Sequence, residues 1–482
     1  MLLKELIKGM DIVDVKGNID IEIENIAYDS RKVKNGSMFT CIQGFKADGH
    51  DFIPMAVQNG ARALLVQKSV EAGEDITVIR VKDTRFATAL MASRFFGNPS
   101  GKFELVGVTG TKGKTTTTYM IKAILEAANK KVGLIGTIVN SIGSEVLPAE
   151  RTTPESYDLQ ALFAEMVEKK VDGVVMEVSS HALDLHRVSG SDFDIGIFTN
   201  LSRDHLDFHE TFENYLNAKI KLFKLCKQGL VNIDNEYGRE VVKRAECPLY
   251  TMGIDNEADI KAYDIVTHPG SVEFKVHTPW GEGDMKVNIP GRFSVYNAMC
   301  AIGACSIMGI PLEDIKQGLL HVSVPGRAEV VHAGKDFTII IDYAHTPDSL
   351  ENILKTVKSY APGRVVCMFG CGGDRDKTKR PIMGEISGVL ADFTIITSDN
   401  PRTEEPATII EDIEGGIKNS GASYITIVDR REAIRYSIEQ AQKNDIIVLA
   451  GKGHETYQIF KDKTIHFDER EVVDEILRGI RE

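Results

Sequence analysis

The stretch from Gly110 to Thr116, G-T-K-G-K-T-T, contains the residue types of a phosphate-binding loop. Such a loop needs exposed backbone N–H groups, a lysine for charge and a hydroxyl for Mg²⁺. Lys114 would reach the outer phosphates, and Thr115 would ligate the metal at a helix N-terminus, where the dipole favours negative charge. Val108 stands where the usual pattern has its first glycine, which costs one flexible position but no N–H group.

The alternative for this stretch is a Gly/Thr-rich turn that caps a helix. The apolar run F-E-L-V-G-V-T comes directly before the loop, and a segment with apolar residues at helical spacing follows it. Because strand, loop and helix arrive in the order that a phosphate loop requires, we favour the phosphate loop.

Acidic and histidine side chains near the end of later apolar runs could hold a metal. Glu177 ends the run D-G-V-V-M-E-V-S and is followed by Ser179. A carboxylate at a strand tip suits Mg²⁺, although an exposed loop acid would look the same in isolation. His205 and His209 are four residues apart in R-D-H-L-D-F-H, a spacing that also fits zinc. No third zinc ligand is evident, so zinc is disfavoured.

The composition limits the class of protein. The chain has 482 residues, 43% of them hydrophobic, and a net charge of -13. This length predicts two to four domains of a soluble protein. The negative charge argues against general binding to nucleic acid or anionic membranes. No secretory signal or membrane span is evident, and the seven cysteines lack a zinc or disulfide pattern. We expect a cytoplasmic protein that acts on small molecules as a monomer.

The elements that must position these residues predict an α/β protein of three domains. Residues 1–98 read as a small mixed α/β domain. Residues 99–325 contain short apolar runs typical of a parallel sheet, and an alternating stretch near 273–289 predicts an inserted hairpin. A plausible hinge at about 322–330 precedes a Rossmann-like domain, 326–482.

Five strands are predicted in the last domain, and five polar or Gly-rich segments follow them. In a parallel sheet such loops share one edge, where ligands bind. The segments are Y-A-H-T-P-D-S, C-G-G-D-R-D-K-T-K-R-P, D-N-P-R-T-E-E-P, R-R-E-A and K-G-H-E-T-Y-Q.

These strings, together with E-V-S-S-H-A-L, T-N-L-S-R-D-H-L-D-F-H, N-A-K-I-K-L-F, F-S-V-Y-N-A-M-C-A and P-G-R-A-E, resemble the Mur ligases over the whole chain. These cytoplasmic enzymes use ATP to assemble the peptidoglycan stem peptide. The resemblance implies that a substrate carboxylate takes the γ-phosphate of ATP and that the acyl phosphate then reacts with an amine. It points to the addition of meso-diaminopimelate to UDP-N-acetylmuramoyl-L-alanyl-D-glutamate.

The resemblance also assigns the nucleotide site. Metal ligands would be Thr115, Glu177 and His205 for Mg²⁺, with His209 structural. The residues expected to contact ATP are Gly110, Thr111, Lys112, Gly113, Lys114, Thr115, Thr116, Asn297, Arg327 and Asp342, with His345 in the loop after Asp342. From the residues alone, Asn297 could equally be an amide on a helix surface. Lys219 is expected to be carbamylated by CO₂ and to act with Lys114, Glu177 and His205 in catalysis.

Two further sets would bind the other substrates. For the UDP-sugar peptide the set is Ser30, Thr152, Thr153, Ser179, Arg187 and Lys219, with His50 a further candidate. For diaminopimelate it is Arg375, Asp399, Asn400, Pro401, Arg402, Gly451 and Glu455. Arg402 would grip the far carboxylate with a two-pronged pair. Two positions differ from the family pattern: Leu185 replaces a common Gln, and Lys112 replaces a common Asn or Ser.

Three rival functions remain at this point. A lysine-adding ligase of the same family would not need Arg402. A folylpolyglutamate synthetase, which has a similar phosphate loop, would lack the UDP-binding first domain and the D-N-P-R loop. A nucleotide-gated switch would hydrolyse ATP without an amino acid.

Overall fold

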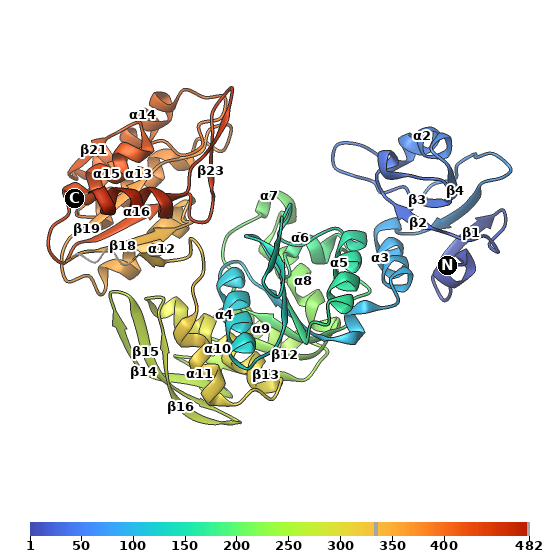
Figure 1. The fold of residues 1–482 in the computed structure, drawn as a ribbon, viewed down its shortest axis with the longest axis horizontal. Helices are drawn as coiled ribbons and strands as arrows, with labels where there is room; N and C mark the ends of the chain where they lie inside the picture. The colour runs from blue at the N-terminus through green and yellow to red at the C-terminus, as the bar shows by residue number, and fades with distance from the viewer. Residues whose placement is uncertain (332–335, 480–482) are drawn as a thin grey trace. The chain divides into compact units, whose positions relative to one another are not determined.

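The computed structural model describes residues 1–331 and 336–479, and the chain divides into two compact units, Met1–Ala258 and Asp259–Glu482. Figure 1 traces the chain from blue to red and labels the elements. Within the described ranges, no helix combines the length and apolar composition needed to cross a bilayer.

The first unit begins with a five-stranded sheet in the order β1-β5-β4-β3-β2. Strands β2 to β5 run parallel, and β1 pairs antiparallel with β5. A helix that ends at Gln58 leads through Asn59-Gly60 into the strand that begins at Ala61. The elements are α1 (Leu3–Leu6), β1 (Ile12–Lys16), β2 (Asn25–Ala27), β3 (Ser37–Thr40), α2 (Ile53–Gln58), β4 (Ala61–Val66), β5 (Thr77–Val81) and α3 (Thr84–Phe95).

A second sheet of the first unit has the order β13-β12-β11-β6-β10-β7-β8-β9. Its strands from β13 to β7 are parallel, as the apolar runs predict, and β8 and β9 form an antiparallel edge. The strands are β6 (Glu104–Thr109), β7 (Val132–Ile135), β8 (Asn140–Ile142), β9 (Glu145–Leu147), β10 (Gly173–Glu177), β11 (Phe193–Phe198), β12 (Cys226–Asn232) and β13 (Leu249–Gly253).

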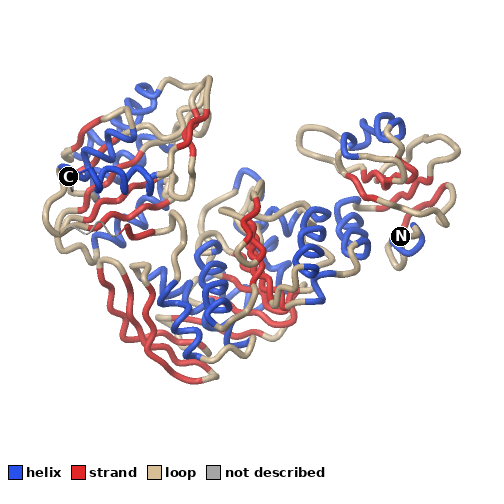
Figure 2. Tube along the Cα trace, viewed as in Figure 1, coloured by secondary structure: helices blue, strands red, loops and turns tan. Residues whose placement is uncertain are grey.

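Helices follow these parallel strands and pack against them, as Figure 2 shows in blue and red. Central strands are buried on both faces, which accounts for their continuous apolar sequences. The helices are α4 (Lys114–Ala127), α5 (Ser156–Glu168), α6 (Ser180–Asp184), α7 (Leu206–His209), α8 (Phe212–Ile220) and α9 (Glu236–Arg244).

The second unit opens with an antiparallel meander, β14 (Ile260–His268), β15 (Ser271–Thr278) and β16 (Gly281–Val287). The predicted hairpin corresponds to β15 and β16. Two helices, α10 (Arg292–Ile307) and α11 (Leu312–His321), follow and pack on the meander.

A six-stranded sheet completes the second unit, in the order β17-β18-β22-β19-β20-β21. The five predicted strands, β18 to β22, are parallel, and β17 is antiparallel. The strands are β17 (Glu329–Val331), β18 (Thr338–Asp342), β19 (Val365–Phe369), β20 (Phe393–Ile396), β21 (Tyr424–Thr426) and β22 (Ile446–Ala450), with a hairpin β23 (Tyr457–Ile459) and β24 (Thr464–His466). The helices are α12 (Pro347–Lys358), α13 (Lys379–Leu390), α14 (Pro406–Ile417), α15 (Arg430–Glu439) and α16 (Glu469–Gly479).

One prediction for this sheet is wrong. The segment R-R-E-A is the first turn of α15 and not a ligand loop. Asp429 caps the helix by accepting a hydrogen bond from the N–H of Glu432, and Arg430 is buried. Polar residues after a strand suggested a loop, whereas a capped helix start has the same composition.

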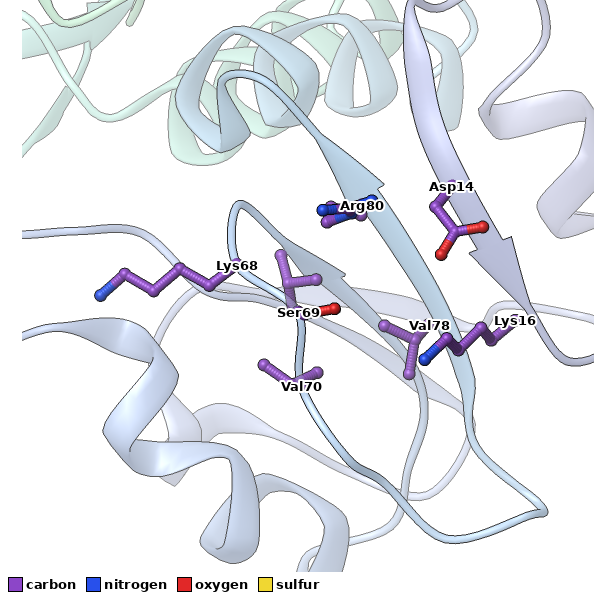
Figure 3. Close-up of a pocket in the computed structure, with 8 residues that line it drawn as sticks. Asp14, Lys16, Lys68, Ser69, Val70, Val78 and Arg80 are labelled. Atoms are coloured by element: carbon purple, nitrogen blue, oxygen red, sulfur yellow. The ribbon is translucent and has the colours of Figure 1, made fainter.

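Figure 3 shows a hollow beside β1 and β5, where Asp14 and Arg80 face each other across paired strands. Its volume is about 10 Å³, which is room for a single water at most. The hollow is lined by none of the residues expected to bind a substrate.

Candidate functional site

The predicted phosphate loop joins β6 to α4. Lys114 Nζ donates to the carbonyls of Gly110 and Thr111 at 2.9 and 3.0 Å, so the lysine lies over its own loop. A Cβ on Gly110 would lie 1.9 Å from Thr199 Oγ1, which excludes any other residue there without movement. Val108 is buried within β6 and pairs with Glu177. The position of the missing first glycine therefore belongs to the strand, where flexibility is not required.

The Glu177 carboxylate is 1% exposed and lies beside the first turn of α4. Thr115 Oγ1 donates to its Oε1 at 3.0 Å. Thr137, just after β7, donates its N–H to Oε1 at 2.8 Å and its hydroxyl to Oε2 at 3.1 Å. Two of the three expected metal ligands are thus adjacent. Sequence reasoning missed Thr137, although its place at the end of an apolar run was a usable signal.

A carboxylate and a hydroxyl oxygen are the donors that Mg²⁺ prefers, and this ion keeps several further ligands from water and phosphate. The pair Thr115 and Glu177 fits such an ion. Among the described residues there is no cluster of three His, Cys, Asp or Glu side chains, as a zinc site would need.

Lys219 and His205 belong to a neighbouring group. Lys219 is 1% exposed in α8, and its Nζ lies 4.4 Å from the ring centre of Tyr215. Burial, and next the charge of Lys114, hold the pKa of Lys219 well below its usual value. The His205 ring lies 6.2 Å from Tyr215, and burial lowers its pKa. His209 is buried and shares a 2.9 Å hydrogen bond with Ser180, as its expected structural part requires.

Hydroxyl groups and one arginine surround the backbone beside Glu177. Thr153 Oγ1 donates to the Glu177 carbonyl at 2.8 Å and accepts from the Ser179 N–H at 3.1 Å. Thr152 Oγ1 lies 3.0 Å from Thr137 Oγ1. Arg187 donates to the Thr153 carbonyl at 3.2 Å and forms a 2.9 Å ion pair with Glu155. Thr152, Thr153, Ser179 and Arg187 are therefore brought together.

The two residues proposed from the first domain lie elsewhere in the unit. The Ser30 hydroxyl is buried and contacts the sulfur of Met55 at 3.3 Å. His50 Nδ1 lies 2.6 Å from Asp48, and its Nε2 accepts from the N–H of Gln67 at 3.1 Å. Both ring nitrogens of His50 are engaged within the protein.

In the second unit, the loop after β20 and the loop after β22 meet. Asn400 Nδ2 donates to Glu455 Oε2 at 2.8 Å. Lys452, fully buried, reaches Asn400 Oδ1 at 3.2 Å and Glu455 Oε2 at 3.0 Å. A Cβ on Gly451 would lie 2.8 Å from Asp399 Oδ2. Sequence reasoning missed Lys452, which looks like any charged loop residue.

The remaining members of that set surround Gly372. A Cβ on Gly372 would lie 3.1 Å from Arg402 Nη1 and 3.9 Å from Arg375 Cγ. Arg402 has a positive φ of 53°, and its Nη1 donates to the Gly373 carbonyl at 2.7 Å. Pro401 is buried between Asn400 and Arg402. The structure thus gathers all seven expected residues at the carboxyl edge of one sheet, the edge at which ligands of open parallel sheets generally bind.

Three residues expected at the nucleotide site, Arg327, Asp342 and His345, lie around Tyr343 and form a third group. Asp342 Oδ2 accepts from the Ala328 N–H at 2.7 Å, and the Arg327 guanidinium lies 4.8 Å from the ring centre of Tyr343. His345 Nδ1 lies 2.8 Å from the Tyr343 carbonyl. Asn297 is 6% exposed in α10, so the alternative of an amide on the helix surface is wrong.

His454 titrates within this group and gives a pH test. Burial lowers its pKa to about 4, and the nearby positive charges of Arg327 and Arg470, with His345, act in the same direction. Between pH 6.5 and 4 the unfolded chain therefore binds a proton at His454 that the folded chain does not bind. The free energy of unfolding falls over this range as the pH drops, by up to about 3 kcal/mol. His454→Phe keeps a ring against Tyr343 and should flatten this loss. The measurement is urea unfolding at pH 7, 6, 5 and 4. An equally steep loss in the variant would contradict it.

Comparison with known proteins identifies the family. Three family models match: Mur ligase family, catalytic domain, over residues 22–96; Mur ligase middle domain over 108–305; and Mur ligase, glutamate ligase domain, over 326–453.

Curated relatives match over the full length. UDP-N-acetylmuramoyl-L-alanyl-D-glutamate--2,6-diaminopimelate ligase of Clostridium perfringens is 52% identical over 99% of this chain and 100% of its own. The enzyme of that name from Clostridioides difficile is 48% identical over 99% of each chain. A solved structure of a ligase of the same name is 30% identical and covers 100% of this chain and 99% of its own, with a TM-score of 0.76.

A folylpolyglutamate synthase of Mycobacterium tuberculosis, complexed with ADP and AMPPCP, is 16% identical, with a TM-score of 0.61 over 76% of this chain and 92% of its own. That likeness concerns the fold alone. The three matching models and the full-length relatives at about half identity lead to one conclusion: the chain belongs to the Mur ligase family.

Proposed function

We propose that this chain uses ATP to join meso-diaminopimelate to UDP-N-acetylmuramoyl-L-alanyl-D-glutamate, in peptidoglycan synthesis in the cytoplasm. The observation that carries the proposal is the meeting of Asp399, Asn400 and Glu455 beside two arginines at one sheet edge. Full-length relatives named for this reaction support it. We also propose three functional domains, 1–98, 99–325 and 326–482, in a monomer.

The chemistry begins with the phosphate loop. A carboxylate cannot react directly with an amine, because its oxygen is a poor leaving group. The glutamate carboxylate of the sugar peptide would attack the γ-phosphate of ATP to give an acyl phosphate and ADP. Lys114 would neutralise charge on the transferred group. Thr115 and Glu177, with His205, would hold Mg²⁺, which supplies further charge neutralisation when bound.

The amine of the amino acid would then attack the carbonyl carbon of the acyl phosphate. A tetrahedral intermediate forms, and its collapse releases inorganic phosphate and leaves an amide. The cluster Thr152, Thr153, Ser179 and Arg187 offers hydroxyl donors and a guanidinium for the phosphate and carboxylate groups of the sugar peptide. Ser30 would add a contact from the first domain.

Lys219 is proposed to carry a carbamate. Carbamylation requires an uncharged amine that attacks CO₂, and burial disfavours the charged form of this side chain. The product is an anion, which would balance the positive charge of Lys114 close by. Attack forms an N–C bond while one C=O π bond of CO₂ opens and leaves its electron pair on oxygen, and the amine loses one proton to solvent.

The amino-acid end of the site explains the proposed choice of diaminopimelate. The end of diaminopimelate whose amine does not react has an ammonium and a carboxylate. Arg375 and Arg402, which both lie near Gly372, could hold the carboxylate, while Asp399 and Glu455 could hold the ammonium. Lysine has no far carboxylate, so the arginines would have no partner in a lysine complex.

The function is tested by following phosphate release from ATP with a panel of amino acids, including meso-diaminopimelate, lysine and glutamate. We expect release only when ATP, the UDP-sugar dipeptide and diaminopimelate are all present. Equal release without the sugar peptide would contradict a ligase mechanism, and preference for lysine would point to the lysine-adding ligase.

Arg402→Ala should lose diaminopimelate use while ATP binding persists. Loss of a bidentate charged contact should lower kcat/KM for diaminopimelate by about 100-fold, because such a contact contributes about 1.5–3 kcal/mol. The matched control is Arg431→Ala, since Arg431 is an exposed arginine of α15 paired with Glu475. Steady-state kinetics measures both. Unchanged diaminopimelate kinetics in the Arg402 variant would remove the part assigned to this residue.

Lys219→Met should abolish the carbamate and most of the ligase activity. Incubation with ¹³C-labelled CO₂ should give a carbamate carbon signal by NMR in the unsubstituted protein and none in the variant. Lys221→Met, a half-exposed lysine paired with Asp184, is the control and should keep the signal. A signal of equal strength in the Lys219 variant would show that another amine is modified.

A further inference from the structure

Arg430 is a buried side chain to which the proposed reaction assigns no part. It is the first residue of α15 and is 1% exposed. Its Nε donates to Glu469 Oε1 at 2.9 Å, and its Nη2 lies 2.8 Å from the same oxygen. The Glu469 side chain is also fully buried, at the start of α16. Removal of two charges from water is expensive, so this pair calls for a physical reason.

The rest of the guanidinium binds two backbone carbonyls. Nη1 donates to the Ser398 carbonyl at 3.2 Å, and Nη2 donates to the Ala450 carbonyl at 2.9 Å. Ser398 directly precedes Asp399, and Ala450 directly precedes Gly451. One side chain therefore contacts the residue before each of the two loops of the amino-acid site. These loops, which begin at Asp399 and at Gly451, are the two arms of the site.

The sheet itself does not join these two arms. Strand β19 lies between β22 and β20 in the sheet order, so no ladder hydrogen bond links β22, which ends at Ala450, to β20, which ends at Ile396 shortly before Ser398. Arg430 joins the two arms at their base through its hydrogen bonds to the Ser398 and Ala450 carbonyls. Further along the two loops, Lys452 and the Asn400–Glu455 hydrogen bond join the same arms.

The spacing between the arms has little tolerance. The Cβ that an alanine would place at Gly451 lies only 2.8 Å from Asp399 Oδ2. A small separation of the arms would break the Asn400–Glu455 contact, and only a residue without a side chain at position 451 lets the arms lie this close. Misplacement of about 1 Å in a binding site can cost about 100-fold in rate.

We propose that Arg430 is a positioning residue for the amino-acid site, with Glu469 as the carboxylate that orients its guanidinium. This inference rests on the proposed function, because it takes the two arms to be the amino-acid site. A lysine cannot replace the arginine, since a single ammonium lacks the planar fork that reaches a carboxylate and two carbonyls at once.

The first test is Arg430→Lys, which keeps the charge. We expect the KM for the amino acid to rise at least about tenfold, with the KM for ATP and for the sugar peptide within about twofold of normal. The matched control is Arg364→Lys. Arg364 lies just before β19 and pairs with buried Asp445, just before β22, at the amino edge of the same sheet. Its replacement by lysine should leave all three KM values within about twofold of normal.

A second variant separates stability from positioning. Replacement of a buried ion pair by apolar residues of similar volume is often neutral for stability. Arg430→Met combined with Glu469→Leu should therefore keep the thermal unfolding midpoint close to normal, yet keep the raised KM for the amino acid. A merely structural pair would instead show normal kinetics once stability is restored.

The outcomes are distinct. Normal amino-acid KM in either folded variant overturns the proposal, as does a parallel rise in all three KM values. Failure of both variants to fold would also overturn it, because the pair would then serve the fold. If the unsubstituted enzyme prefers lysine, the proposed substrate is wrong, but the same KM comparison made with lysine still tests Arg430.

Discussion

The buried carboxylate of Glu177 is the constraint on which the region around the Gly110–Thr116 loop depends. It accepts hydrogen bonds from Thr115 on α4 and from Thr137 after β7, while its own backbone carbonyl accepts from Thr153. A buried carboxylate costs free energy unless its oxygens are satisfied, so these neighbours must be present for the fold to tolerate it. The requirement brings the predicted phosphate loop and the hydroxyl cluster to one place.

In the second unit the buried groups that need partners are positively charged. Buried Lys452 and Arg430 need carboxylates and carbonyls. These come from the end of β22, from the loops after β20 and β22, and from Glu469 at the start of α16. In both units these buried charged groups lie at the carboxyl edge of a parallel sheet. There the chain leaves the hydrogen-bonded ladder of the strands, so its polar groups can bind other partners. Charge compensation within the protein thus shapes surfaces that are suited to charged substrates.

Burial also sets the chemical state of individual groups. Lys219 lies in α8 against Tyr215 with no carboxylate of the described residues in ion-pair range, and burial holds its pKa well below the usual value. An exposed lysine on an amphipathic helix would remain protonated at neutral pH and would not react with CO₂. The same sequence position can therefore be inert or nucleophilic, depending only on what covers it.

Much of this protein follows from its sequence alone. The strand–loop–helix order around Gly110, the continuous apolar strands and the loop D-N-P-R are local patterns, and local sterics and periodicity determine them. The tertiary structure decided what lies far apart in the chain: the partners of Glu177, the burial of Asn297 and Lys219, and the insertion of β22 between β18 and β19. It also corrected R-R-E-A, because a helix cap and a ligand loop have the same composition. These features depend on which segments pack together, and no single segment encodes that.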